Sequence, residues 1–394
     1  MTNTLPEKNS CCGCSVCSNA CPQNAITMEY DDEGFLYPNV LENKCIDCGL
    51  CAKICPNNHT SDLNNPFLKV YGGYSLDSVV MENCTSGGFV TELSKLVIRS
   101  GGVVAGVRYT SDYIKAEYDI ATTPEELKAF MGSKYVQSEK NDIYIRVKAQ
   151  LEASQKPVLF VGCPCDVYGL KRFLNKNYQN LVTCELVCMG VTSYKIAEYY
   201  KKYTQNKNGS ELVYINARSK KKGWYVPHLE EVFENGETKL STLYGTIYGY
   251  SSQVYNRPSC FTCCYRGENG VGDFRVGDFW GIKPTDEFWN PKGVSCVFVR
   301  TKKGLEYAEE LSKHNFAIFE TTYDYATKNN MSSRINKSEK YLLRRKKFAE
   351  IYKSQGLIKA CKKTEDFNFK IKKIMPNFMK VWAKKTYHYF KDKS

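Results

Sequence analysis

The chain has 394 residues, 42% of them hydrophobic, which is enough for two or three domains with ordinary cores. We find neither an apolar run that could cross a membrane nor a secretory signal, so we expect a cytoplasmic protein, with contact to a membrane surface left open. Disulfide scaffolds are typical of small secreted domains, so 19 cysteines in such a chain favour metal or redox chemistry. The net charge is +13, but residues 339–394 alone hold 17 Lys and Arg against five Asp and Glu.

Two cysteine runs in the first 56 residues share the spacing C-x2-C-x2-C-x3-C-P, and the second run repeats the first 34 residues later. This segment resembles bacterial two-cluster ferredoxins, in which three close thiolates bind one [4Fe–4S] cube and the fourth Cys reaches the other cube. The predicted ligands are Cys11, Cys14, Cys17 and Cys55 for one cluster, and Cys45, Cys48, Cys51 and Cys21 for the other. Cys12 lies outside the spacing. A zinc site is the alternative, but it would use groups of four rather than two runs of this shape.

The residues after each cysteine run predict the limits of the first domain. Ile26, Met28 and Tyr30 alternate with polar residues before the turn DDEG, which indicates a short hairpin. Residues 57–66 are polar and rich in turn formers, so we expect a linker there, with the ferredoxin domain spanning 1–62.

Residues 84–109 predict a helix followed by a buried strand. Apolar residues recur at i, i+4, i+7 and i+8 from Phe89, and VVAGV follows the Gly101-Gly102 turn. Ser-Gly-Gly at 86–88 begins the helix, where free N–H groups can bind phosphate, although such residues are also ordinary caps. Lys134, in MGSKYVQS, is either a phosphate or flavin contact or a solvated loop residue.

Two strand–turn–helix segments place cysteines at strand ends. Residues 158–161 form an apolar strand, Gly162-Cys163-Pro164-Cys165 is a tight turn, and Asp166 can cap the next helix. A second strand ends near Cys188. Ligands bind at such edges of α/β layers, and a thiolate at a helix start is stabilised.

The stretch RPSCFTCCYRG, at 257–267, holds the pair Cys260 and Cys263 with no second pair nearby. Four-thiolate sites need two such pairs, so the remaining ligands must come from elsewhere. The segment 270–282 follows with turn residues and with the aromatic residues Phe279 and Trp280, which are usually core packing.

The C-terminal segment is basic, and we expect it to be helical. Acidic ferredoxins, anionic lipid or nucleic acid could each bind such a charge, and Trp382, Tyr387, Tyr389 and Phe390 supply aromatic rings; nucleic acid is the weakest of the three. A merely solvated helix face is the alternative.

Six motifs occur in a characteristic order: SGGFVTEL, GSKYVQS, GCPCDVYGLKRFL, LVCMGV, RPSCFTC and GDFWGI. Over about residues 68–300 the chain thereby resembles the coenzyme F420 hydrogenase/dehydrogenase beta-subunit family. The resemblance implies an α/β body with FAD and an additional [4Fe–4S] cluster. The implied cluster ligands are Cys165, Cys188, Cys260 and Cys263. The implied FAD contacts are Ser86, Gly87, Gly88, Lys134 and Asp278.

Three positions differ from the family pattern, which tends to have Thr at Cys163, Gln at Asp166 and His at Met189. These positions lie near the predicted redox centre and count against coenzyme F420 as the acceptor, although coenzyme F420 is retained as a further candidate cofactor. The other thiols, Cys84, Cys184, Cys296 and Cys361, fit buried structural roles.

The predicted fold is an α+β ferredoxin-like head with two cluster loops and short hairpins, fused to an α/β flavin-binding body with a mixed sheet and a basic helical tail. We expect the head at 1–62, the body at 67–300, an extension of the body at 301–338 and the tail at 339–394.

The predicted function is that of an iron–sulfur flavoprotein oxidoreductase that passes electrons between ferredoxin-type clusters and FAD, and so to or from a small organic acceptor. We expect a ferredoxin or flavodoxin as redox partner and an anaerobic setting. Similar sequences with a fused ferredoxin head are typical of bacterial surface-polysaccharide gene clusters. The alternatives are a non-catalytic electron-wiring subunit of a larger redox complex and reduction of coenzyme F420 itself. Four isolated histidines offer no obvious acid–base catalyst.

Overall fold

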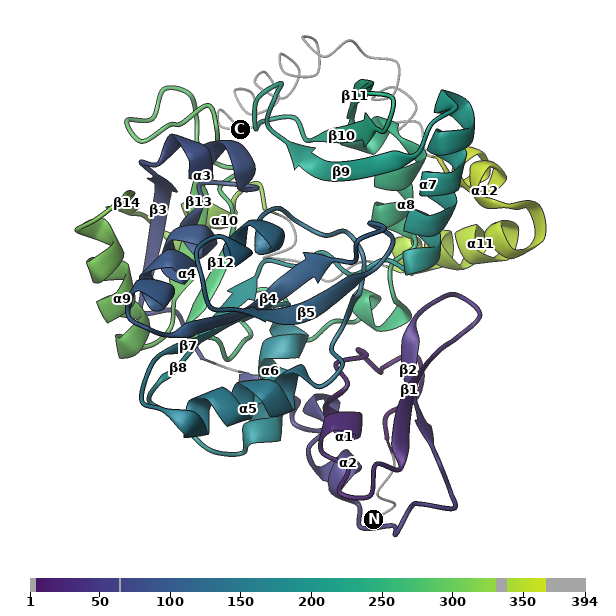
Figure 1. Ribbon diagram of the computed structural model, residues 1–394, viewed down its shortest axis with the longest axis horizontal. Coiled ribbons are helices and arrows are strands. Elements are labelled where there is room, and N and C mark those ends of the chain that lie inside the picture. The colour runs from purple at the N-terminus through teal and green to yellow at the C-terminus, as the bar shows by residue number, and fades with distance from the viewer. Residues whose placement is uncertain (1–4, 64, 331–338, 366–394) are drawn as a thin grey trace.

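The structure is a computed structural model that describes residues 5–63, 65–330 and 339–365 (Figure 1). A large sheet with helices on both faces forms the body. A small sheet with its own helices lies beside it, and the N-terminal segment forms a separate lobe next to α6 (Figure 1).

The N-terminal lobe, which we call the head, is a hairpin flanked by two one-turn helices. Strands β1 (Ile26–Tyr30) and β2 (Leu36–Val40) pair antiparallel, which confirms the predicted hairpin. The Asp31 carboxylate accepts hydrogen bonds from the backbone N–H groups of Glu33 and Phe35 and thereby closes the turn. The short helices α1 (Val16–Asn19) and α2 (Leu50–Lys53) lie within the two cysteine runs, and η1 (Pro56–Asn58) and η2 (Thr60–Leu63) follow.

The body sheet has nine strands in the order β14-β3-β13-β12-β8-β7-β4-β5-β6 and is mixed, as predicted. Strands β12, β8, β7 and β4 run parallel to one another, and the outer neighbours on both sides are antiparallel to them. The bounds in sheet order are β14 (Phe316–Glu320), β3 (Lys69–Ser75), β13 (Ser295–Val299), β12 (Phe274–Asp278), β8 (Leu181–Leu186), β7 (Val158–Gly162), β4 (Val103–Tyr109), β5 (Ala116–Ala121) and β6 (Ser138–Glu139).

Successive side chains of the central strands point to opposite faces, and each face has its own helical cover. Leu159 and Val161 of β7 pack with α4 (Phe89–Arg99) and α9 (Lys302–Ser312). Val158 and Phe160 pack on the other side with α5 (Ile143–Ala153) and α6 (Pro164–Leu174). Near-continuous apolar strands of this kind are what a sheet covered on both faces requires. Short helices α3 (Ser78–Asn83), η3 (Glu126–Phe130) and α10 (Tyr323–Thr327) connect the layers.

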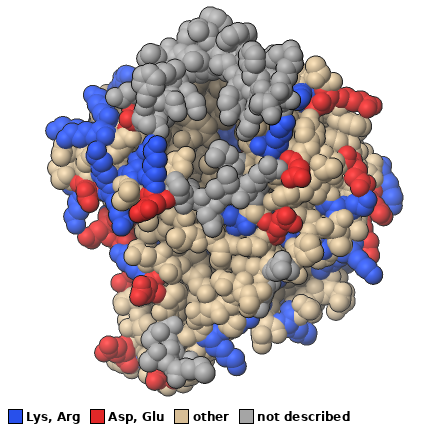
Figure 2. Space-filling view, turned by 180° about the vertical axis from the view of Figure 1, so that it is seen from behind, with Lys and Arg blue, Asp and Glu red and all other residues tan. Residues whose placement is uncertain are grey.

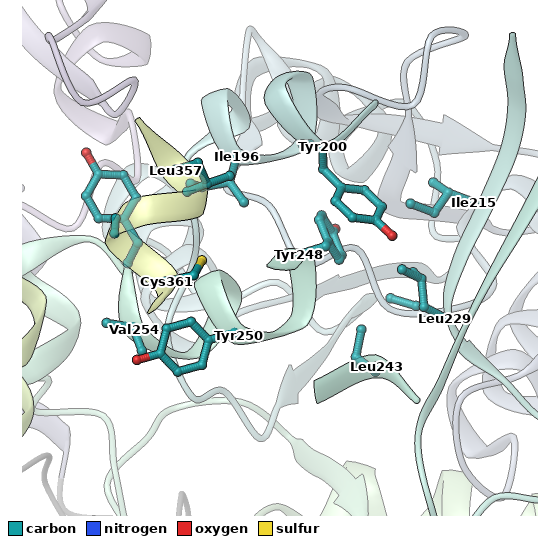
Figure 3. Packing of buried hydrophobic residues seen from close by; sticks show 14 of the residues in the cluster. Ile196, Tyr200, Ile215, Leu229, Leu243, Tyr248, Tyr250, Val254, Leu357 and Cys361 are labelled. Carbon is teal, nitrogen blue, oxygen red and sulfur yellow. The ribbon is translucent and has the colours of Figure 1, made fainter. Parts of the chain in front are cut away.

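The small sheet has the order β11-β10-β9 and is antiparallel. Its strands are β9 (Leu212–Ser219), β10 (His228–Phe233) and β11 (Thr238–Thr242), and it packs with α7 (Tyr194–Asn208), η4 (Leu243–Gly245) and α8 (Ile247–Val254). Figure 3 shows Tyr200, Tyr248 and Leu229 meeting in its core. The turn η5 (Pro258–Phe261) then leads from α8 back to the body.

Two helices from the basic C-terminal segment complete this core. Helices α11 (Glu339–Gln355) and α12 (Leu357–Thr364) confirm the predicted helical structure of this segment up to residue 364. They bury Phe348, Leu357 and Cys361 in the core of the small sheet. Figure 3 shows Leu357 and Cys361 there, beside α8. This part of the segment is therefore built into the fold rather than merely solvated. The aromatic residues Trp382, Tyr387, Tyr389 and Phe390 lie outside the described residues.

On the face shown in Figure 2, Lys and Arg are interspersed with Asp and Glu. Within residues 5–63, 65–330 and 339–365, no helix is both long and apolar enough to cross a bilayer.

Candidate functional site

The carboxyl ends of the four parallel strands lie on one edge of the body sheet, and the predicted site residues follow them. Cys163 and Cys165 come after β7, Cys188 comes after β8, and Asp278 ends β12. Open α/β sheets bind ligands at this edge because the loops that leave the parallel strands converge there. The chain topology therefore brings distant motifs together at one place.

In the head, the cysteines fall into an inner and an outer group. Burial, together with the nearby thiols of Cys11 and Cys55, raises the pKa of Cys17 to about 12, so these three thiols are neighbours. Burial likewise raises the pKa of Cys51, and its thiol neighbours are Cys48 and Cys21. The fourth Cys of each run thus lies with the other run. The assignment of these thiols to two cubes stays a prediction.

Exposure separates the two groups. Cys11, Cys14, Cys17 and Cys55 are all buried, whereas Cys45 and Cys48 are exposed. Ile46 between them is 61% exposed, so the loop of the outer group lies at the surface. The inner group instead faces the body: Tyr144 of α5 donates a hydrogen bond to the backbone oxygen of Cys14 over 2.9 Å.

A cavity of about 210 Å³ lies where the head meets the sheet edge, and thiols surround it. We call it the cysteine cavity. Its cysteines are Cys12, Cys163, Cys165, Cys188, Cys260, Cys263 and Cys264. All four residues predicted for the third cluster are among them, and they come from the ends of two strands and from the 257–267 turn.

Thiols of the cysteine cavity occur in close pairs. Cys163 and Cys188 are within hydrogen-bond contact, and this contact lowers the pKa of Cys188 to about 6. Cys12 is in similar contact with Cys14 and Cys165; these contacts outweigh burial and hold the pKa of Cys12 well below its usual value. The same contacts raise the pKa of Cys163 and of Cys165 well above the usual value. Thiolates rather than thiols bind metal, so each pair offers one thiol that is suited to ligation.

A buried ion pair borders the cysteine cavity. The Nζ of Lys140 lies 3.0 Å from the Asp166 carboxylate, and both side chains are 3% exposed. We expected Asp166 to cap α6, but this is wrong: Cys163 occupies the N-cap position and Asp166 turns to Lys140 and to the Tyr118 hydroxyl. A buried carboxylate needs a counter-charge more than the helix end needs a cap.

A second buried network supports the 257–273 loop from beneath. The Glu185 carboxylate accepts hydrogen bonds from Arg275 over 2.7 Å and from Arg300 over 3.1 Å. It also accepts the backbone N–H groups of Val271 and Gly272 over 2.8 Å each. Arg275 lines the cysteine cavity, so the network joins the loop that carries Cys260 and Cys263 to strand β8.

A second and larger cavity, of about 750 Å³, lies at the end of β4, and we call it the large cavity. Its volume falls in the range of cofactor sites. Tyr109, Tyr113 and Tyr214 give it aromatic walls, and Lys95, Arg108, Lys128 and Lys134 line it as well.

Lys134, a predicted FAD contact, is half-buried in the wall of the large cavity, and desolvation lowers its pKa to about 7. Its Nζ donates hydrogen bonds to the backbone oxygens of Ala129, Met131 and Gly132 over 2.9–3.1 Å. All three donors of the ammonium are therefore in use. Lys134 braces this turn and can act on a bound anion as a point charge.

The other predicted FAD contacts lie close by but are largely committed to the fold. The N–H of Gly87 donates to the Ser295 hydroxyl over 3.0 Å, and Ser86 donates to the backbone oxygen of Val294 over 2.8 Å. At Gly88, φ is +84°, a conformation that favours glycine. A 3.0 Å contact between the hydroxyls of Thr85 and Ser133 joins this turn to the Lys134 segment.

Asp278 is bound on both carboxylate oxygens. Arg218 donates to it over 2.9 and 3.0 Å, and the Trp224 indole N–H donates over 2.8 Å. Trp224 in turn stacks on Trp280 with ring centroids 4.9 Å apart. In this structure Asp278 orients an aromatic wall.

The two cavities are neighbours because one short segment lines both. Lys134 borders the large cavity and Gln137 borders the cysteine cavity. Three residues of fully extended chain span at most about 11 Å. A ligand in one cavity would thus lie close to a ligand in the other.

The donor set fits iron–sulfur chemistry. Among the described residues, no group of three Cys, His, Asp or Glu side chains is placed to hold a single metal ion. A cube offers four irons at its corners, so its thiolates surround a volume rather than meet at a point. Seven thiols around one cavity match that requirement.

Comparisons with known proteins agree with this donor set. Residues 10–59 match the family model of a 4Fe-4S dicluster domain. Residues 70–143 and 155–324 match the models for the N-terminal and C-terminal parts of the coenzyme F420 hydrogenase/dehydrogenase beta subunit. The chain belongs to this beta-subunit family. It is an iron–sulfur protein that resembles the electron-transfer subunits of oxidoreductases.

Solved structures that are similar to this chain include a chain of the F420-reducing [NiFe] hydrogenase complex from Methanosarcina barkeri, determined as a xenon derivative. It has 20% sequence identity and a TM-score of 0.47, over 65% of this chain and 82% of that chain. No curated protein matches the chain.

Sequence reasoning missed several residues of this family member's site. Cys12 was outside the ferredoxin spacing, although the doubled Cys11-Cys12 was a visible signal. Lys140 and Lys220 gave no signal, because single lysines are common on surfaces. Lys220 nonetheless donates to the Cys84 sulfur over 3.2 Å and to the backbone oxygen of Ser86. Folding alone reveals that these charges are turned inward.

Proposed function

We propose that the protein is an iron–sulfur flavoprotein oxidoreductase that moves electrons between a protein partner at the head and a small organic molecule at the body. Iron–sulfur clusters exchange single electrons and a flavin exchanges one or two, so together they join one-electron partners to two-electron chemistry. The chain's part is to hold these groups in order.

The observation that carries the proposal is a series of thiols from the surface to the sheet edge. Exposed Cys48 lies near enough to Cys51 to act on its charge, and the same holds for Cys51 with Cys17 and for Cys17 with Cys14. Cys14 contacts Cys12, and Cys12 contacts Cys165. The outer group would meet a ferredoxin or flavodoxin. The buried inner group of the head would hold a second cluster, and the half-buried thiols Cys165, Cys188, Cys260 and Cys263 of the cysteine cavity would hold a third.

FAD is proposed to bind in the large cavity. The tyrosines there offer flat apolar walls for its rings, and Lys134 with Lys95 and Lys128 offers positive charge for its diphosphate. Ser86, Gly87 and Gly88 would shape the neighbouring turn, and Asp278 would act through the Trp224–Trp280 stack.

Two other functions fit the same site. A wiring subunit would use the same thiols but turn over only with a partner enzyme, and a deazaflavin reductase would accept coenzyme F420. Met189, which follows Cys188 in the chain and stands where the family tends to have His, is 53% exposed and has no proton-donating side chain. This favours an acceptor other than coenzyme F420, and a role in surface-polysaccharide biosynthesis stays a prediction.

The test is to measure iron, acid-labile sulfide and flavin on protein purified without oxygen, and then to add reduced ferredoxin. Three cubes correspond to roughly 12 irons per chain, and we expect one FAD that bleaches on mixing. Roughly eight irons without flavin would overturn the proposal and leave the head as a ferredoxin module. Full loading with flavin oxidation only in the presence of a second enzyme would select the wiring subunit.

A further inference from the structure

Cys12 belongs to the head in sequence but to the body in space. It is next to Cys11, yet its side chain lines the cysteine cavity with Cys165, Cys188, Cys260 and Cys263. Successive side chains of an extended chain point to opposite sides. The doubled cysteine can therefore present one thiol to the inner head group and the next to the body.

The backbone around Cys12 is held firmly against the body. Arg257, which is fully buried, donates from Nε to the backbone oxygen of Cys11 over 2.7 Å. Gln137 donates to the backbone oxygen of Cys12 over 3.2 Å and accepts from Arg257 over 3.0 Å. The direction of the Cys12 side chain is thus fixed by the junction and is not that of a free loop.

Gly13 makes this close approach achievable. Its φ is +68°, and a Cβ built there would lie 2.6 Å from Gln137 Nε2 and 2.8 Å from Arg257 Nη1. No side chain fits between the head backbone and these two groups. Each of the first three residues of Cys-Cys-Gly-Cys therefore packs closely against Arg257 or Gln137 of the body.

The thiols of the cysteine cavity exceed the four corners of one cube. Cys12 is in contact with Cys14 of the head and with Cys165 of the body, and Cys163 is in contact with Cys188. Cys14 does not line the cysteine cavity, whereas Cys12 and Cys165 both do. Two thiols that touch cannot bind separate irons of a cube without moving apart, so each contact pair within the cavity corresponds to one corner. Cys260 and Cys263 supply the other two corners.

We propose that Cys12 and Cys165 form one shared ligand corner of the body cluster, so that a thiolate from the head can replace the body's own. In the exchange, the Cys12 sulfur forms an Fe–S bond as the Cys165–Fe bond breaks, and the proton of the Cys12 thiol passes to the released Cys165 sulfur. No electron is gained or lost. The head would then be a structural part of the body cluster as well as its electron partner.

This inference rests on the proposed function, because it needs the third cluster, and iron counting separates the two. The variants are Cys12→Ala, Cys165→Ala and the double variant Cys12→Ala/Cys165→Ala. The matched control is Cys165→Ala/Cys264→Ala. Cys264 lines the same cavity, but the thiols that act most strongly on Cys165 are Cys12 and Cys163. Each protein is purified without oxygen for iron and sulfide analysis and for electron paramagnetic resonance after reduction.

We expect both single variants and the control to keep roughly 12 irons, and the double variant to fall to roughly eight while the head signals stay. The resonance of the body cluster should shift in Cys165→Ala, because its ligand has changed. Loss of four irons in either single variant, or in the control, would overturn the shared corner. So would a double variant that keeps every iron. Roughly eight irons in the unmodified protein would overturn the proposed function as well.

Discussion

Eight of the nine head cysteines lie in two short runs of one spacing, whereas the thiols of the cysteine cavity come from residues 12, 163–165, 188 and 260–264. The head brings its ligands together by local chain geometry and by the exchange of the fourth Cys between its two runs, and its outer loop stays at the surface. The body needs its sheet topology, two buried charge networks and the docked head. The two regions should therefore fail differently when they are altered.

Cys48→Ser should separate the head from the body most clearly. Cys48 is exposed at the outer end of the thiol series, so its loss should remove about four irons and abolish reduction of the flavin by ferredoxin. The body cluster, the flavin and reduction of the flavin by dithionite should remain. Lys44→Gln, in the same exposed loop, is the control and should keep all three cubes. Ferredoxin-driven reduction that survived in Cys48→Ser would place the entry point elsewhere.

The body should be most sensitive at Glu185. Glu185→Gln leaves Arg275 and Arg300 without their buried counter-charge, so we expect the free energy of unfolding to fall by about 4 kcal/mol, as measured in urea. Glu320→Gln breaks only an exposed pair with Lys69 and is the control, with little change expected. Equal losses of unfolding free energy in the two variants would mean that the Glu185 network does not stabilise the 257–273 loop.

The pH dependence of this network has a definite sign. Burial alone would raise the pKa of Glu185, but Arg275 and Arg300 outweigh it and hold the pKa below its usual value. Its stabilising effect is thus complete above the pKa of the unfolded chain and is lost as the pH falls through the folded value. Glu185→Gln should remove this part of the acid sensitivity.

The junction between the two regions is tested by Gly13→Ala. Both the positive φ and the contacts with Gln137 and Arg257 oppose a side chain, so we expect a loss of about 2 kcal/mol in the free energy of unfolding and slower electron transfer into the body. Gly236→Ala shares the positive φ, +85°, but meets nothing within 4 Å, and it isolates the backbone strain. A Gly13 variant no worse than the Gly236 variant would show that the junction has room to adjust.

The same contrast explains what the sequence could predict. The hairpin, the helix from Phe89, the strand before Gly162 and the mixed sheet follow from local periodicity and turn residues. Cys12 facing Cys165 and Lys140 facing Asp166 do not, because these pairs depend on how the head docks and how the strands are ordered. Asp166 was misjudged for the same reason, since a buried lysine distant in sequence decided its orientation.

The large cavity offers a smaller and reversible effect. Because burial lowers the pKa of Lys134 to about 7, its charge is lost as the pH rises through that value, and only the charged form attracts a diphosphate. We expect FAD affinity to fall about tenfold between pH 6 and pH 8.5, as followed by flavin fluorescence. Lys134→Arg should bind without this pH dependence. Lys128→Gln is the control at the same cavity and should keep the pH dependence; a flat profile in the unmodified protein would contradict the role of Lys134.

The smallest effect should come from the contact between the head and the C-terminal helix α11. Arg345 is buried, donates from Nε to the backbone oxygen of Asn256 over 3.1 Å, and binds both oxygens of Glu33 in the head hairpin. Glu33→Gln should cost about 1 kcal/mol of unfolding free energy at low salt and less at 1 M salt, because Glu33 is 28% exposed and partly screened. Asp32→Asn removes a pair with Lys353 that is at least 81% exposed on both sides and serves as the control, with no change expected. If the two variants behave alike, the head is held by Arg257 and Gln137 at the cysteine junction, and the basic helix contributes packing to the small sheet but no clamp on the head.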